Sequence, residues 1–272
     1  QSMTLLMIVF RSLRQHMLST VITSLSIALA GGLILSVWVI KDQSNAAFTD
    51  VNSGFDAVLG ARSSKLQLVL NSIFHVEASP GNLAWEDYED IRKHPGVANA
   101  IPIAVGDNYR GFRLVGVTPD LFTETEYREG KRYTLQPNGR WIDPTRREAV
   151  VGGFAAAQLG LNVGDTFHPY HGLLFDEEKQ HAETYVVVGI MELSNTPADR
   201  VIWIPLAGLQ KMSGHDPKTA SDVSAVLIKL RNPQAGFRLD MMYNKQGNRL
   251  TLAWPIDQIM AQLFRKISWF DK

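Results

Sequence analysis

The 272 residues contain no cysteine. This excludes disulfide frameworks, thiolate nucleophiles, iron–sulfur clusters and zinc sites built on cysteine. An excess of charge is also missing, because 27 Lys and Arg residues balance 27 Asp and Glu residues. Without a net positive charge the protein has no global field that would attract nucleic acid, so we expect no nucleic-acid partner.

Sequence motifs for nucleotide binding and for catalysis are absent as well. The fragment nearest to a GxxxxGK[ST] loop is Gly130-Lys131-Arg132, which lacks the preceding glycine and the hydroxyl residue that a phosphate cradle needs. The sequence contains neither a GxSxG elbow nor an HExxH pair. We therefore expect that the chain is not an enzyme, that it holds no cofactor of its own, and that any ATP is bound by a partner.

A long uncharged stretch runs from Met17 to Ile40. As a helix with a rise of about 1.5 Å per residue, these 24 residues are long enough to cross the roughly 30 Å hydrocarbon core of a bilayer. Arg11 and Arg14 precede the stretch, whereas Lys41 and Asp42 cancel each other on its far side. The length of the stretch predicts one spanning helix at 17–40. The positive-inside rule then predicts that an amphipathic segment at 1–16 is cytoplasmic and that everything after Lys41 lies outside.

A cleaved signal peptide and a buried soluble helix are the alternatives to an uncleaved anchor. Ser44-Asn45-Ala46 has the small residues that a signal peptidase reads, but the apolar region exceeds the usual 7–15 residues and a charged pair separates it from that site. Gly31-Gly32 and an apolar surface on all sides fit lipid better than a soluble core. We therefore expect an uncleaved anchor.

Beyond the anchor, the residue pattern predicts an α+β domain. Apolar residues recur at helical spacing between Leu66 and Ile73 after a capping Ser63-Ser64, which predicts a helix at 64–75. His94-Pro95-Gly96 is a stop signal for a second helix that begins after Asn82. Further helices are predicted at 153–161 and 206–213, and strands at 97–105, 112–117, 149–152, 184–190, 201–204 and 223–230.

The last 18 residues predict a strongly amphipathic helix at 255–272. Pro255 is tolerated at a first helical position, and Trp269 and Phe270 are aromatic residues of the kind found at membrane interfaces. A helix that reaches a membrane surface suggests that the natural protein continues beyond residue 272. Apolar residues fall on one face of this helix at steps of three and four: Ile256, Ile259, Met260, Leu263, Phe264, Ile267 and Phe270.

Taken in order, these segments resemble the MacB-like and FtsX-like permeases of ABC transporters. The resemblance covers nearly the whole chain and depends on the order of its pieces after an uncleaved anchor. The pieces are RSLRQHMLSTVITSLSIALAGGLILSVWVI at 11–40, FDAVLGARSSKLQLVLNSIFH at 55–75, PGVANAIPIAVGDNYRGFRLVGVTPDLF at 95–122, EAVVGGFAAAQLGLNVGDTF at 148–167 and TYVVVGIMELSNTPADRVIWIPL at 184–206.

The resemblance implies a permease with four transmembrane helices, of which this chain holds the first, and a large periplasmic domain between helices one and two. It implies a two-subdomain mixed α/β domain of the MacB-like periplasmic core type. A porter-like subdomain would comprise 52–125 and 222–254, and an inserted subdomain would comprise 126–221. Stalk helices would lie at 41–51 and 255–272.

The resemblance also implies partners and a location. Such permeases work as homodimers in the bacterial inner membrane, with an ABC ATP-binding subunit whose closure moves the periplasmic domains. A periplasmic adaptor or substrate-carrying protein and membrane lipid are further expected partners. The substrate stays open, because relatives at this level serve lipoprotein release, efflux and control of wall hydrolases.

Such coupling requires stiff helices between membrane and domain. Phe48, Val51 and Phe55 offer an apolar face on the first stalk that could match the face of the C-terminal helix. Packing within one chain and packing between two chains of a dimer both remain open for this face. The expected stalk and interface residues are Phe48, Val51, Phe55, Ile256, Ile259, Met260, Leu263, Phe264 and Ile267.

One cluster of potential metal ligands stands out. His168, His171 and His181 are three of the seven histidines and lie within 14 residues, together with the carboxylates of 176–178. Imidazole and carboxylate suit zinc, copper or nickel without any thiolate. A plain hydrophilic hairpin tip is the alternative interpretation. A membrane-anchored binding module for a metal or a metal-carrying protein, acting without an ATPase, is accordingly the second function hypothesis beside the permease.

Overall fold

A computed structural model describes residues 5–49, 53–212, 221–247 and 249–268 of the chain. The chain divides into two compact units, residues 1–47 and 48–272.

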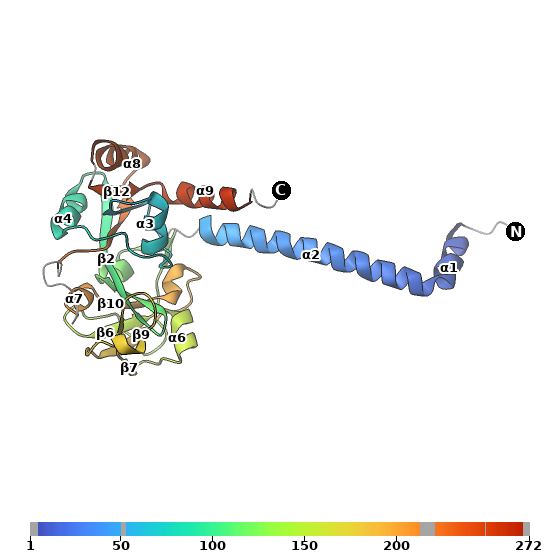
Figure 1. Ribbon diagram of the computed structural model, residues 1–272, viewed down its shortest axis with the longest axis horizontal. Helices are drawn as coiled ribbons and strands as arrows, with labels where there is room; N and C mark the ends of the chain where they lie inside the picture. The colour runs from blue at the N-terminus through green and yellow to red at the C-terminus, as the bar shows by residue number, and fades with distance from the viewer. Residues whose placement is uncertain (1–4, 50–52, 213–220, 248, 269–272) are drawn as a thin grey trace. The chain divides into compact units, whose positions relative to one another are not determined.

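The N-terminal unit consists of two helices, α1 (Leu5–Gln15) and α2 (Met17–Thr49), drawn in blue in Figure 1. The segment Met17–Ile40 of α2 is long and apolar enough to cross a membrane, by length and composition. The hydroxyl groups of Ser26 and Ser36 donate hydrogen bonds to carbonyl oxygens one turn earlier, at 2.9 and 2.8 Å. Their polar atoms are thus satisfied inside the helix, as a lipid environment requires.

The second unit is built on a mixed sheet, in which ten strands of the described residues pair in the order β12-β1-β11-β2-β3-β10-β6-β9-β7, with β8 added to β2. Most neighbours are antiparallel, whereas β10 pairs in parallel with β3 and β9 with β6. The strands are β1 Ala57–Ala61, β2 Val97–Tyr109, β3 Phe112–Val117, β6 Glu148–Val151, β7 Thr166–Phe167, β8 Tyr170–His171, β9 Tyr185–Ile190, β10 Ile202–Pro205, β11 Ala225–Leu230 and β12 Leu250–Ala253. A separate ribbon pairs β4 (Glu126–Arg128) with β5 (Lys131–Arg132).

Helices cover both faces of this sheet. Residues of α4 (Trp85–Lys93), α6 (Gly153–Leu159), α7 (Leu206–Gln210) and α8 (Pro233–Asp240) belong to a first core cluster. Residues of α3 (Lys65–Ser72), α5 (Asp120–Thr123) and α9 (Ile256–Ser268) belong to a second core cluster. The shorter helical turns are 3-10 at Glu177–Lys179 and Pro197–Arg200 and π at Met241–Gln246.

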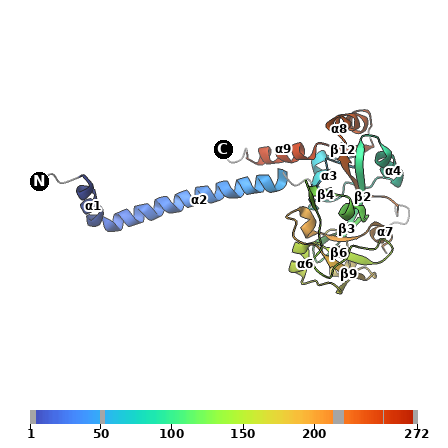
Figure 2. The ribbon, with the colours of Figure 1, turned by 180° about the vertical axis from the view of Figure 1, so that it is seen from behind.

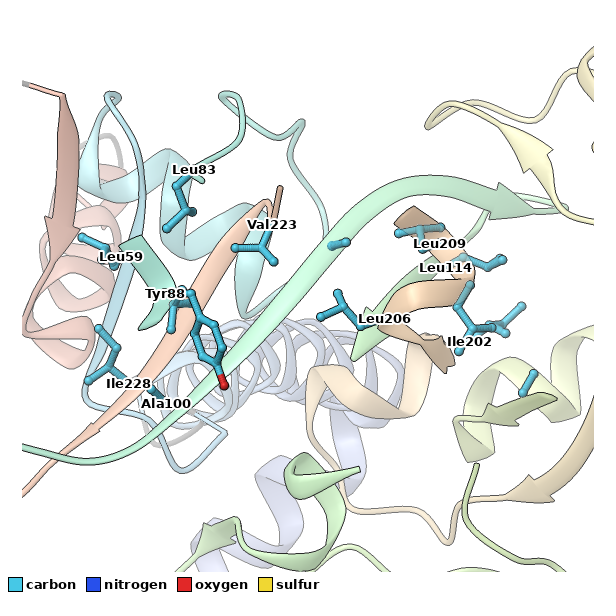
Figure 3. Packing of buried hydrophobic residues seen from close by; sticks show 14 of the residues in the cluster. Leu59, Leu83, Tyr88, Ala100, Leu114, Ile202, Leu206, Leu209, Val223 and Ile228 are labelled. Atoms are coloured by element: carbon cyan, nitrogen blue, oxygen red, sulfur yellow. The ribbon is translucent and has the colours of Figure 1, made fainter. Parts of the chain in front are cut away.

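The two core clusters follow from the alternation of side chains along each strand. In β1, Leu59 belongs to the first cluster and its neighbour Val58 to the second, because successive residues of a strand point to opposite faces. In the first cluster, Leu206 and Leu209 of α7 lie beside Leu114 of the sheet (Figure 3). The domain is therefore a sheet buried on both sides, which confirms the predicted mixed α and β class.

Local signals explain where several helices begin and end. The Ser64 hydroxyl accepts a hydrogen bond from the Gln67 backbone N–H at 3.0 Å and caps α3. Gly160 ends α6 in the left-handed region, with φ of 67°. The predicted helices at 64–75 and 153–161 are confirmed, each a few residues shorter than expected.

The sheet also runs through both chain segments that were expected to form separate subdomains. Strands β12, β1, β11, β2 and β3 come from 52–125 and 222–254, and β10, β6, β9 and β7 come from 126–221. In Figures 1 and 2, α4, α8 and β12 lie at one end of the domain, whereas α6, β6 and β9 lie at the other. The two groups of strands meet where β3 pairs with β10.

Candidate functional site

A hairpin at residues 168–181, called the histidine hairpin below, is attached to the far end of β2. Its first arm contains β8, which pairs antiparallel with β2 so that His171 faces Asp107 across the ladder. Its second arm returns beside the first, because the His181 backbone N–H donates a hydrogen bond to the carbonyl oxygen of Pro169 at 2.8 Å. The hairpin therefore brings two histidines that are ten positions apart in the sequence to one place on β2.

The position of Asp107 depends on an irregularity in β2. The pairing of β2 with β3 shifts register between Val105 and Asp107, and such bulges commonly re-aim a side chain at functional sites. The Asp107 side chain is 0% exposed. Because burial of a carboxylate is costly unless polar or cationic groups surround it, the groups around this side chain decide its role.

Three side chains converge at this point. Asp107 Oδ1 lies 3.4 Å from His171 Nδ1 and 3.4 Å from His181 Nε2. One ligand atom from each of the three residues lies within 4.8 Å of the other two. The imidazole rings meet edge to face, with centroids 5.5 Å apart and an interplanar angle of 78°. The cluster is half open to solvent, because the His171 side chain is 50% exposed and the His181 side chain 5%.

The neighbouring Asn108 fixes the histidine hairpin on β2. Its buried amide nitrogen donates hydrogen bonds to the carbonyl oxygens of Gly172 at 2.8 Å and Leu174 at 3.2 Å. The Gly172 backbone N–H donates to Asp107 Oδ1 at 3.3 Å, and Gly172 has a positive φ of 85°, which a glycine adopts without strain. The hairpin is therefore held to β2 at Gly172 and Leu174, which follow β8.

The charge of Asp107 also affects the buried phenol of Tyr185. Burial raises the pKa of Tyr185 to about 12, and the charges of Glu183 and Asp107 add to this while Arg147 opposes it. The phenol thus stays protonated throughout the physiological range. Tyr185 is therefore a neutral neighbour of the cluster and not an acid or a base there.

The structure brings together two of the three histidines that were predicted as metal ligands. His171 and His181 come together, whereas His168 is not part of the group of converging ligand atoms. The third member, Asp107, lies 64 positions before His171 in the sequence and was not singled out there. Metal binding itself stays a prediction.

The predicted stalk face on α9 lies against the domain. Ile256 and Met260 are 2% and 1% exposed and belong to the second core cluster together with Phe55. Ile259 and Leu263 pack against the same cluster while partly buried. The backbone N–H of Ile256 donates to the Asp56 carbonyl oxygen at 3.3 Å. The first two turns of α9 are thus fixed to the sheet and to the start of β1.

The remaining stalk residues lie outside the described part. Val51 falls in the undescribed segment 50–52. Phe48 belongs to α2, and Phe264 and Ile267 belong to α9, but the description does not extend to their side chains. Contacts of these four residues stay predictions.

Comparison with known proteins decides the family. A family model described as the MacB-like periplasmic core domain matches residues 20–236, which is most of the chain. The chain belongs to this family. No curated protein matches it.

Among the solved structures to which this chain is similar are the following two. One is the extracellular domain of the noncanonic ABC-type transporter YknZ from Gram-positive bacteria, at 15% identity and a TM-score of 0.42, covering 72% of this chain and 99% of that one. The other is the periplasmic region of MacB from Actinobacillus actinomycetemcomitans, at 13% identity and a TM-score of 0.49, covering 79% of this chain and 94% of that one. The family assignment rests on the match over residues 20–236.

Proposed function

We propose that this chain is part of the permease subunit of an ABC transporter of the MacB and FtsX type. In this proposal, a separate ATPase hydrolyses ATP in the cytoplasm and moves the periplasmic domain, which exports, releases or regulates a periplasmic substrate or partner. The observation that supports the proposal most strongly is the family match, which begins inside helix α2 and extends through the domain to residue 236.

The packing of α9 supports a mechanical role. A force applied along a helix moves a domain as one body only if the helix is fixed to the domain core. Ile256 and Met260 fix α9 in the second core cluster, which also contains residues of β2, β3 and β11. Movement of α9 would therefore be transmitted to the central strands of the sheet.

The charges that flank α2 support the orientation. Arg11 and Arg14 on the N-terminal side of the spanning segment favour a cytoplasmic N-terminus, so the domain would lie in the periplasm and α2 in the inner membrane. We propose that the full-length subunit is a homodimer with a periplasmic adaptor or substrate carrier as a further partner. The division into a porter-like subdomain and an inserted subdomain belongs to the same proposal.

The proposal assigns ATP binding to a separate subunit. In support of this, these 272 residues contain no phosphate-binding loop.

The test is to isolate the full-length protein from its native membrane in a mild detergent and to identify by mass spectrometry what is isolated with it. We expect an ABC ATP-binding subunit in near-equal amount. Another ABC transporter of the same membrane, isolated in parallel, serves as the control for the conditions. Absence of any ATPase while that control stays intact would contradict the proposal.

A further inference from the structure

We propose that Asp107, His171 and His181 form a binding site for a divalent transition metal ion, with Zn²⁺ as the best-fitting ion. The site would join the histidine hairpin to the end of β2. It is independent of the proposed transport function, because it depends only on side chains within the domain.

The spacing of the three side chains fits a tetrahedral ion. Zinc binds imidazole nitrogen at about 2.0–2.1 Å and carboxylate oxygen at about 2.0–2.2 Å, so two such ligands at a tetrahedral angle are about 3.4 Å apart. Both distances from Asp107 Oδ1, to His171 Nδ1 and to His181 Nε2, are 3.4 Å. A charge-assisted hydrogen bond would be shorter, at about 2.7–2.9 Å. Neighbouring ligands of an octahedral Mg²⁺ would also lie closer, at about 2.9 Å.

The ligand types select the same class of ion. Two imidazoles and one carboxylate suit zinc, copper or nickel, whereas calcium and magnesium prefer sites made of oxygen atoms alone. Three protein ligands leave a fourth tetrahedral position for water or an external ligand, as in zinc sites that are not closed. The half-exposed His171 gives the ion a path from solvent.

The site is largely formed before an ion binds. Asp107 is fixed by strand pairing on β2 and accepts the Gly172 backbone N–H at 3.3 Å, and His181 is buried with its backbone bonded across the hairpin. His171 is the member that can move, because its side chain is half exposed. The ligand nitrogen of His171 lies within 4.8 Å of the ligand nitrogen of His181. To bind one zinc ion, the two nitrogens have to come to about 3.4 Å from each other.

The proposal predicts one metal ion per chain and a defined set of variants. The experiment uses the whole chain in mild detergent, carrying a purification tag without histidine and stripped of metal, and titrates it with ZnCl₂ by calorimetry. We expect one Zn²⁺ per chain. Because loss of an outer-shell partner already changes metal affinity by about 10 to 100-fold, we expect His171→Ala and Asp107→Asn each to weaken binding by about 100-fold or more.

His168 provides the matched control, since it lies in the same hairpin outside the group of ligand atoms. We expect His168→Ala to bind Zn²⁺ as tightly as the parent chain. Circular dichroism checks that each variant is folded. If the buried Asp107→Asn variant does not fold, the half-exposed His171→Ala variant still decides the outcome.

Zinc X-ray absorption of the loaded parent chain gives a measurement that needs no variant. We expect a four-coordinate ion with two imidazole ligands. Three results would each overturn the proposal: no Zn²⁺ binding, unchanged binding in His171→Ala, or loss of binding in His168→Ala. A zinc shell made of oxygen ligands alone would do the same.

Discussion

Acidification is predicted to destabilise the domain through one buried histidine. His75 is 8% exposed, and its ring packs edge to face on Trp203, with centroids 5.6 Å apart. Burial lowers the pKa of His75 to about 3; the charge of Arg113 acts in the same direction, and a hydrogen bond to the Asn71 backbone opposes both. The folded domain therefore keeps this imidazole neutral at a pH where the unfolded chain protonates it.

The size of the effect follows from the two pKa values of His75. The folded pKa of about 3 lies below the ordinary value of 6.5, so the unfolded state binds more protons between these values and stability falls as the pH falls below 6.5. At about pH 5, which is about 1.5 units below this ordinary pKa, protonation of His75 stabilises the unfolded chain but not the folded chain. At about 1.36 kcal/mol per unit, this lowers the free energy of unfolding by about 2 kcal/mol relative to about pH 8.

The assay compares urea unfolding of the parent chain and of His75→Asn in the same detergent at several pH values. Asparagine removes the titration and tolerates the backbone φ of 56° at this position. The variant starts less stable at high pH, and we expect the gap to narrow by about 2 kcal/mol, and even to reverse, between about pH 8 and pH 5. A gap that stays constant with pH would refute the reasoning, as would an NMR titration of His75 with a pKa near 6.5.

Two further substitutions test the packing of the domain. Arg140 pairs with the Glu148 carboxylate, which is 7% exposed, and its hydrogen bonds hold the pKa of Glu148 below 4.5. We expect Arg140→Met to lower the free energy of unfolding at neutral pH, and to lower it by less as the pH falls below 4.5, where the carboxylate of the unfolded chain becomes protonated. Urea unfolding at several pH values measures this, and a loss that does not depend on pH would contradict it. We expect Met260→Ala to lower the free energy of unfolding in urea by about 3 kcal/mol, because it leaves a cavity under α9. The exposed control Gln258→Ala should change this free energy by less than about 0.5 kcal/mol. Equal effects of the two substitutions would show that α9 is not packed in the core.

The sequence pattern was sufficient for elements whose signals are local. The long apolar helix α2, the helices α3 and α6 and the central strands have uncharged length, caps or β-branched runs of their own. Strand β1 was not predicted because it is short and contains Gly60, where a Cβ would collide with the Leu68 side chain. Helix α8 was not predicted because Gly236 lowers helix propensity. A glycine is needed at this position because a Cβ would collide with the indole ring of Trp254, which lies against the helix. Both elements depend on contacts with distant residues, which a local pattern does not contain.

The candidate metal site could also be predicted only in part, because one of its residues is distant from the others in the sequence. His171 and His181 could be found because they are close in the sequence. Asp107 could not be found by spacing, because only the pairing of β8 with β2 brings it to them. A signal was nevertheless present: Asp107 and Asn108 are residue types that are depleted in strands, and they follow shortly after the apolar stretch 100–105.

The most direct test of the proposed coupling is a distance measured on α9 in the complete transporter. Because the 272 residues contain no cysteine, Gln258→Cys on the exposed side of α9 gives a single site in this region for a spin label. Pulsed electron paramagnetic resonance would compare the label-to-label distance between two copies in the nucleotide-free complex and in the complex trapped with ATP and vanadate. The account predicts that the distance distribution shifts between the two states. An unchanged distribution in a complex that hydrolyses ATP would contradict it.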